Sequence, residues 1–263
     1  MSLMKRFQEQ KKKDPTYGTG NSFAVLGTMP ASPIARQQAV AGFEKELEDD
    51  LAKLKLIRSR KQKEAEKAAH LVPKYLPVVE TLKASGSDHP LLGQILVWLF
   101  DIADIHGAMA LALYCIEHKV PMPERFRRDL PIYLCDTITE WAEGEQDAGR
   151  SVEPYFGQVC ELAQGWDIPD EVSAKMNKLQ GLVAMDLEAW SDAVTHFECA
   201  EEYGAKVKTV LGKARKKLES AEAMEKEATE KEATEKEATE KEAVEPEEPS
   251  TESSETEQIS GTE

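Results

Sequence analysis

Two aspartates and a histidine stand close together in DIADIH, residues 101–106. Carboxylate oxygens and an imidazole nitrogen bind divalent cations, and an enzyme that cuts a phosphodiester would need such ligands to hold Mg²⁺. Asp101 and Asp104, with His106 beside them, are therefore the candidate metal ligands. The alternative is that Asp104 caps the following helix, because an aspartate at a helix start accepts hydrogen bonds from free backbone N–H groups.

No other pattern of catalytic residues is present. The chain has no phosphate-binding loop, no GxSxG or HExxH motif and no zinc-ligand spacing, so the catalytic residues are unknown. The nuclease interpretation would add only Mg²⁺ as a cofactor, and no other cofactor is indicated.

Basic side chains are the second group that can do chemistry. Clustered Lys and Arg neutralise phosphates and give salt-dependent binding that is independent of sequence. A solvated helix face is the alternative, and the aromatic partners of a single-strand binder are missing between the basic residues. The candidate DNA-binding residues are Arg58, Arg60, Lys61, Lys63, Arg125, Arg127 and Arg128, with a further basic stretch at Lys206–Lys217.

Charge is distributed unevenly along the 263 residues. The formal net charge of −16 divides into +5 for residues 1–70, −9 for residues 71–221 and −12 for residues 222–263. Because charge is screened over about 8 Å at physiological salt, the acidity of a terminal segment says little about what the body binds. The overall acidity therefore does not exclude an anionic partner.

The cysteine spacing and the hydropathy of the chain indicate the kind of cellular compartment in which the protein resides. Cys115, Cys135, Cys160 and Cys199 are widely spaced and fall on apolar helical stripes, which predicts buried thiols in a reducing compartment. The longest apolar run, LLGQILVWLF, is too short to span a bilayer, so no membrane segment is expected.

The N-terminal part has two predicted regions. Residues 1–40 show no sustained period and predict a mobile basic arm. Residues 41–70 predict a long amphipathic helix, because Phe43, Leu47, Leu51 and Leu54 repeat every three or four positions. Its narrow apolar seam would either pair with a second copy as a coiled coil or lie on the body.

Residues 71–221 predict a compact all-α domain. The proline-punctuated VPKYLPVVETL segment and an SGSDHP turn precede a series of helices, and no stretch alternates with period two. We expect Leu91–Phe100 to be buried on most sides, Asp104 to begin the next helix, Pro121 and Pro123 to stop it, and Pro131 to open another.

A tetratricopeptide-like spacing occurs near the end of this domain. Gly181, Ala193, Phe197 and Ala200 occupy the small and aromatic positions of such a helix pair. Small residues would let two antiparallel helices approach while Phe197 fills the space between them. A looser version of this spacing occurs at Ala108, Ala112 and Cys115. Two imperfect units do not make a repeat array, so we expect local helical hairpins.

Residues 222–263 form an acidic low-complexity segment. Its EKEAT repeat provides Glu-to-Lys pairs four residues apart, each of which stabilises a helix by only about 0.2–0.5 kcal/mol. We expect a fraying helix and then disorder after Pro246.

Three segments together identify a family resemblance. WLFDIADIHGAMALALYCIEHKVPMPERFRRDLPIY, IPDEVSAKMNKLQGLV and DAVTHFECA resemble the small subunit of tailed-phage terminases, in the P-two-like coliphage branch also called the terminase endonuclease subunit. The resemblance covers roughly residues 40–220. It implies a homo-oligomer in the cytoplasm of the bacterial host that binds double-stranded viral DNA at the cohesive-end site and passes it to the large ATPase subunit for packaging.

Two questions stay open at this stage. The subunit either directs cutting by its large partner or carries its own metal site, for which Asp101 and Asp104 are the candidates. A second class of function is a tetratricopeptide-like helical adaptor that binds protein segments and makes no DNA contact.

Overall fold

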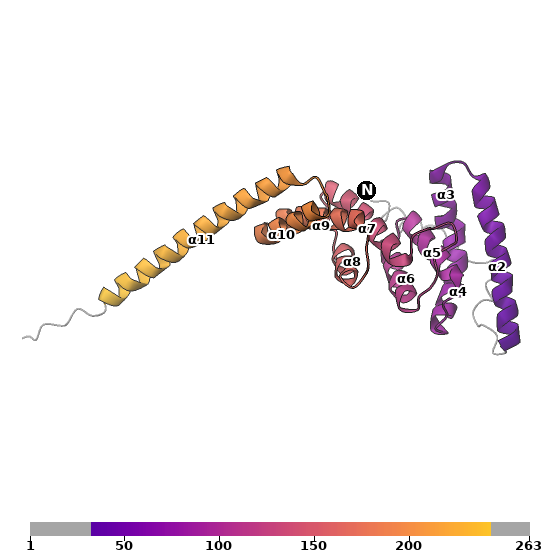
Figure 1. The fold of residues 1–263 in the computed structure, drawn as a ribbon. Coiled ribbons are helices and arrows are strands. Elements are labelled where there is room, and N and C mark those ends of the chain that lie inside the picture. The colour runs from indigo at the N-terminus through magenta and orange to yellow at the C-terminus, as the bar shows by residue number, and fades with distance from the viewer. Residues whose placement is uncertain (1–32, 243–263) are drawn as a thin grey trace, which may run out of the picture.

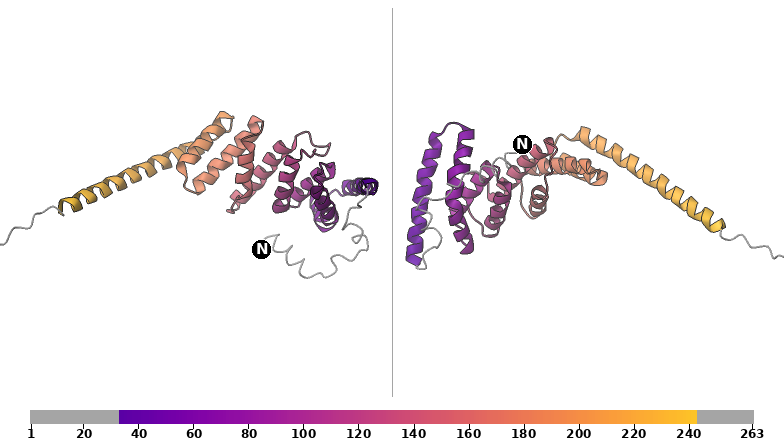
Figure 2. Two further views of the ribbon diagram at one scale, coloured as in Figure 1. Left: turned by 90° about the horizontal axis from the view of Figure 1, so that it is seen from below. Right: turned by 180° about the vertical axis from the view of Figure 1, so that it is seen from behind.

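The computed structural model describes the backbone of residues 33–242 and the side chains of residues 41–231. Every regular element in this range is a helix, which confirms the all-α prediction. The helices follow one another in chain order along an elongated body, with α2 at one end and α11 projecting from the other (Figure 1, Figure 2). Their bounds are α2 (Pro33–Leu56), α3 (Arg60–Glu66), η2 (Lys67–Leu71), α4 (Val72–Ala84), α5 (Pro90–Asp101), α6 (Ile105–Glu117), α7 (Leu130–Asp147), α8 (Tyr155–Ala163), α9 (Asp170–Asp186), α10 (Trp190–Glu202) and α11 (Lys208–Glu242).

The two ends of the chain fit the predicted regions in part. α2 begins at Pro33, within the segment that was predicted to be a mobile arm, and α11 continues to Glu242, well into the acidic segment. The rest of the predicted arm and the predicted disorder after Pro246 lie outside the described residues.

The apolar seam of α2 lies against the body. Phe43, Leu47 and Leu51 are half-buried against the main core, and Leu54 is buried in it. Of the two alternatives for this seam, the structure shows packing within the chain.

A buried carboxylate ties α2 to α4. Asp50, which is only 6% exposed, accepts hydrogen bonds from Lys74 Nζ at 2.7 Å, Lys53 Nζ at 3.0 Å and the Tyr75 hydroxyl at 3.0 Å. Burial raises the pKa of Asp50, but these hydrogen bonds outweigh burial and leave the pKa below its usual value. The ionised carboxylate is therefore the form that holds the two helices together.

The prediction of one continuous helix over residues 41–70 is wrong. α2 ends at Leu56, and a new helix starts at Arg60, where the Ser59 hydroxyl accepts a hydrogen bond from the Gln62 backbone N–H at 3.3 Å. A serine at this place satisfies a free N–H of the first turn, which favours a new start over continuation. α3, the π-helical turn η2 and α4 then follow without a gap, through Pro73 in the first turn of α4 and Pro77 within it.

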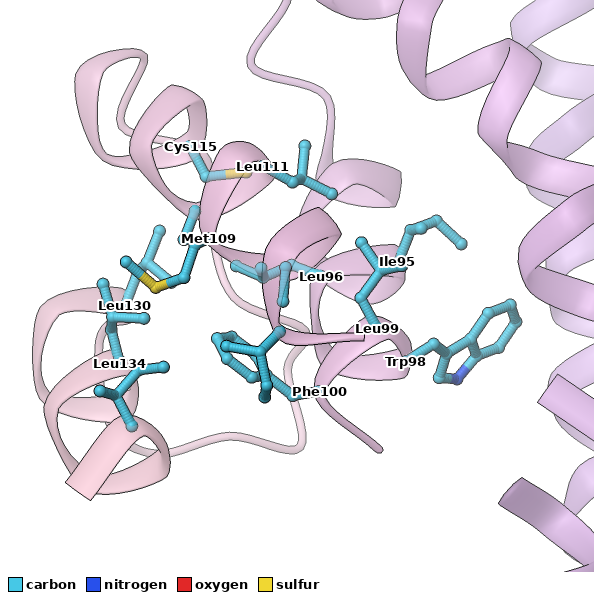
Figure 3. Close-up of a cluster of buried hydrophobic side chains, with 14 of the residues drawn as sticks. Ile95, Leu96, Trp98, Leu99, Phe100, Met109, Leu111, Cys115, Leu130 and Leu134 are labelled. Atoms are coloured by element: carbon cyan, nitrogen blue, oxygen red, sulfur yellow. The ribbon is translucent and has the colours of Figure 1, made fainter. Parts of the chain in front are cut away.

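α5 lies at the centre of the main core. All ten residues from Leu91 to Phe100 are buried, as predicted. Figure 3 shows Leu96 and Phe100 of α5 near Met109 of α6 and Leu130 of α7, while Trp98 points away from them. The Trp98 ring lies 5.9 Å from that of Tyr75 in α4. α5 therefore joins the helices on both of its sides.

Gly93 lets the segment after α6 approach α5. A Cβ built on Gly93 would lie 2.5 Å from the carbonyl oxygen of Pro121. No side chain fits at that distance, so the sequence between α6 and α7 is held directly against the α5 backbone.

The start of α6 and the start of α7 follow the sequence signals. Asp104 Oδ1 accepts from the Gly107 N–H at 3.0 Å, and Asp129 Oδ1 accepts from the Ile132 N–H at 3.1 Å, with Pro131 in the first turn of α7. The end of α6 differs from the prediction. The helix stops at Glu117, before the prolines, and Lys119 has a positive φ of 55°.

α9, α10 and α11 share a second, smaller core. Its buried members are Ala184, Ala193, Phe197, Ala200, Val207, Leu211 and Ala214. A Cβ on Gly181 would lie 2.6 Å from the Phe197 ring, so the expected close approach of α9 and α10 is confirmed. Within the described residues, no helix is both long and apolar enough to cross a membrane.

Candidate nucleic-acid interface

The first predicted basic set lies around the start of α3. Arg58 precedes the helix and Arg60 and Lys61 begin it, and all three are exposed, whereas Lys63 is half-buried. Arg60 Nε donates to Glu64 Oε1 at 2.9 Å. Arg58, Lys61 and Lys63 make no ion pair within the described part of the chain, so their charges are available to an external anion.

The second predicted set lies between α6 and α7, and its three arginines have different environments. Arg125 Nη1 donates to Gln94 Oε1 at 2.6 Å, and its guanidinium lies 4.8 Å from the centre of the Phe126 ring. Arg128 pairs with Asp136 of α7. Arg127 is exposed and has no ion pair among the described residues. The structure thus separates one available cation from two that hold the loop in place.

Burial of the guanidinium lowers the pKa of Arg125. Although much of its side chain is exposed, the guanidinium reaches the buried Gln94. The negative charge of Asp101 opposes that shift. An arginine guanidinium is not deprotonated in proteins, so Arg125 stays charged here and its hydrogen bond to Gln94 is charge-assisted.

Asp101 lies near Lys67, one turn after the first basic set, and near Arg125 of the second set. Its Oδ2 lies 2.5 Å from Lys67 Nζ of η2, and its charge also acts on Arg125. The helical run that begins with the α3 cations and the loop that carries Arg127 therefore both approach the C-terminal end of α5. Periodicity does not predict this proximity, because Lys67 and Asp101 are 34 residues apart in the chain.

The same contacts bear on the predicted metal site. Asp101 is paired with Lys67, and Asp104 caps α6. His106 is exposed, and its Nδ1 lies 3.1 Å from the Tyr155 hydroxyl. In the described residues, no three His, Cys, Asp or Glu side chains are grouped so that they would hold a metal ion. These residues therefore do not fit a Mg²⁺ site as they stand.

The basic stretch at the start of α11 lies far along the body from α3 (Figure 1). Lys208, Lys213 and Lys216 are exposed, Arg215 pairs with Glu198 of α10 at 2.8 Å, and Lys217 Nζ lies 5.6 Å from the centre of the Trp190 ring. The structure therefore does not join this stretch to the α3 set in one cluster.

Burial makes three of the four cysteines unsuited to a reactive site. Cys115 and Cys135 are buried and Cys160 is half-buried, and burial raises the pKa of each thiol to about 12. Cys199 is also half-buried, and all four are free. Thiols with raised pKa values are poor nucleophiles and poor metal ligands.

Sequence reasoning missed the Asp50 network. Asp50 lies three residues after Leu47 and four before Leu54, so it falls on the apolar seam of α2. An acidic residue on a buried helix face requires hydrogen-bond donors, and this pattern was the available signal. The donors on α4, Lys74 and Tyr75, were not predictable from spacing.

Comparison with known proteins gives the chain a family. The model of the phage small terminase subunit matches residues 45–171. A terminase endonuclease subunit of Escherichia phage P2 is 30% identical over 182 residues, which are 68% of this chain and 73% of that protein. The chain belongs to the phage small terminase subunit family.

A second relative is also named as a terminase subunit. A probable terminase endonuclease subunit of Haemophilus phage HP1 is 34% identical over 156 residues, which are 56% of this chain and 56% of that protein. The chain thus spans little more than half the length of that terminase relative. No solved structure matches the chain. The region shared with the family model runs from α2 into α9 and includes both predicted basic sets and Asp101.

Proposed function

We propose that this protein is the DNA-binding small subunit of a phage packaging terminase. It binds double-stranded viral DNA at the cohesive-end site as a homo-oligomer, and it passes the DNA to the large ATPase subunit in the cytoplasm of the bacterial host. The observation that carries the proposal is that the family region holds exposed cations without carboxylate partners among its described residues, namely Arg58, Lys61 and Arg127.

The contacts divide the seven predicted residues into two groups. Arg58, Lys61, Lys63 and Arg127 would contact DNA phosphates, because their charges are not neutralised within the described residues. Arg60, Arg125 and Arg128 would position the surface through Glu64, Gln94 and Asp136. Phosphate contacts of the first group predict affinity that falls steeply as salt rises.

A mobility-shift titration of cohesive-end DNA at about 0.05 M and about 0.2 M salt tests this division. We expect saturable binding that weakens with salt. Arg58→Ala/Lys61→Ala should bind more weakly and reduce the logarithmic salt slope by about 2, and Arg127→Ala should reduce it by about 1. The matched control is Lys175→Ala/Lys178→Ala, which removes two exposed lysines of α9 and should bind as the wild type does.

Two outcomes would overturn the proposal. The absence of a shift at either salt would favour the adaptor function. Equal salt slopes for the wild type and both variants would show that α3 and Arg127 are not part of the DNA interface. Competition with DNA of scrambled sequence separates recognition of the cohesive-end site from general phosphate binding.

For cleavage, we propose that this subunit directs cutting by its large partner. The support is the engagement of Asp101 by Lys67 and of Asp104 by the α6 backbone. Purified full-length protein with supercoiled plasmid and Mg²⁺ should leave the plasmid intact. Nicking that stops with EDTA and is lost in Asp101→Asn or Asp104→Asn would show an intrinsic nuclease instead.

A further inference from the structure

Charge is segregated along α11. Residues 208–218, which we call the basic block, contain five Lys or Arg and no Asp or Glu. Residues 219–242, the acidic block, contain ten Glu and four Lys, which is a net charge of −6. The helix dipole favours acidic residues at the N-terminus and basic residues at the C-terminus. The order in α11 is the reverse, so each block is better placed beside a second, oppositely directed helix than alone.

Only the start of α11 packs on its own chain. Leu211 and Ala214 are buried against α10, but farther along the helix projects away from the body, and no other helix of the described residues lies beside it (Figure 1, Figure 2). At 1.5 Å per residue the acidic block extends about 36 Å. That length is several times the screening distance of about 8 Å at physiological salt, so most of this block cannot act on the cations of its own body.

The face of the basic block away from α10 is open. Lys208, Lys213 and Lys216 are exposed and make no ion pair within the described residues. Gly212 lies among them, and a Cβ built on it would have no atom within 4 Å. Glycine weakens a helix relative to alanine, and packing within the chain does not account for it here. A small residue at this point allows the backbone of another helix to approach closely.

The acidic block has no apolar stripe. A five-residue repeat in an α-helix turns by about 140° per repeat, so each repeat position is distributed around the helix. Glutamates therefore occur on all sides of the acidic block. A partner that binds this block would be recognised by its charge rather than by the burial of apolar surface.

We propose that α11 pairs antiparallel with α11 of a second copy of this chain, so that each basic block lies along the acidic block of the other. A pair centred on the exposed Ala223 sets residues 208–218 of one copy beside residues 228–238 of the other. The two helix dipoles are then opposed, which is their favourable arrangement. This pairing is independent of the proposed DNA binding.

Charge reversal in the full-length protein tests the pairing. Lys213→Glu/Lys216→Glu lowers the net charge of the basic block from +5 to +1, and Glu232→Lys/Glu235→Lys changes that of the acidic block from −6 to −2, so each variant loses most of the charge difference between the blocks. Light scattering at about 0.1 M salt should show that each variant associates at least tenfold more weakly than the wild type, and that an equimolar mixture restores association. At about 1 M salt, where the screening length is about 3 Å, the wild type should also weaken. Lys175→Glu/Lys178→Glu on α9 is the matched control and should associate as the wild type does.

A second measurement separates α11 from any other contact between copies. Ala223→Cys should form an intermolecular disulfide under mild oxidation, and adding Lys213→Glu/Lys216→Glu should abolish it. Circular dichroism checks that helix content is unchanged. No cross-link through Cys at position 223, or no restoration in the mixture of reversed variants, would overturn the proposal. Binding of the acidic block to the large subunit or another basic protein would then be the remaining explanation.

Discussion

Arg125 donates a 2.6 Å hydrogen bond to the side chain of Gln94, which is 3% exposed within α5. This contact joins the loop between α6 and α7 to the most buried helix of the protein. It also shows that the three arginines between α6 and α7 have different roles. One of three neighbouring arginines is anchored inward, another is paired with Asp136, and Arg127 is left to contact an external anion.

Arg125→Ala should therefore act on stability. The Gln94 side chain already has an amide nitrogen without a partner, and the variant would leave its oxygen unsatisfied as well. An unsatisfied buried group costs about 1–3 kcal/mol, whereas surface substitutions stay within about 0.5 kcal/mol. Urea unfolding should show the larger loss for Arg125→Ala and almost none for Arg127→Ala. Equal stability of the two variants would contradict the assigned roles.

The Asp50 network predicts a dependence of stability on pH. Its pKa is lower in the folded state than in the unfolded chain, so the ionised group contributes stability above the unfolded pKa of about 4, and this contribution is lost as pH falls through the folded value. Asp50→Asn should lower the free energy of unfolding by about 1–3 kcal/mol at neutral pH. The difference from the wild type should shrink below about pH 4, as measured by thermal melts across pH. A constant difference would contradict this.

Two glycines allow a matched test of helix packing. Gly181→Ala would place a methyl group 2.6 Å from the Phe197 ring and should destabilise the protein by about 1–3 kcal/mol. Gly144→Ala in α7, where nothing lies within 4 Å, should stabilise it by about 0.5–1 kcal/mol. Opposite signs in chemical denaturation are expected. Stabilisation by both would mean that α9 and α10 are not in close contact.

Asp104 can be tested as a cap rather than as a metal ligand. Asp104→Ala should cost about 1 kcal/mol, while Asp104→Asn should retain most of the stability because asparagine also caps helices. Mg²⁺ should not change the melting temperature of the wild type. A rise with Mg²⁺ that disappears in Asp104→Asn would assign the carboxylate to a metal.

Local sequence signals predicted much of the fold. Asp104 and Pro131 mark helix starts because capping and the fixed φ of proline act within a single turn. The spacing of Gly181 and Phe197 predicted a close helix pair because both positions lie on facing surfaces. Ser59 was overlooked as a cap, since the apolar period continues past it and resembles one unbroken helix.

The candidate site was less predictable for a physical reason. Whether a basic residue is available depends on which acids and amides lie beside it after folding. Gln94 and Asp136 neutralise or anchor neighbours of Arg127 from other helices, and Lys67 meets Asp101 across the body. These are long-range or inter-element contacts that periodicity does not encode. Family resemblance covers both basic sets but does not indicate which of their side chains are paired within the protein.

The five-residue repeat of α11 means that the length of this helix can change in equal steps. Removing or adding one EKEAT unit would change the length by about 7.5 Å while leaving the chemical character of every side of the rod unchanged. The span of this rod can therefore be changed in whole repeat units without any change in the body that carries it.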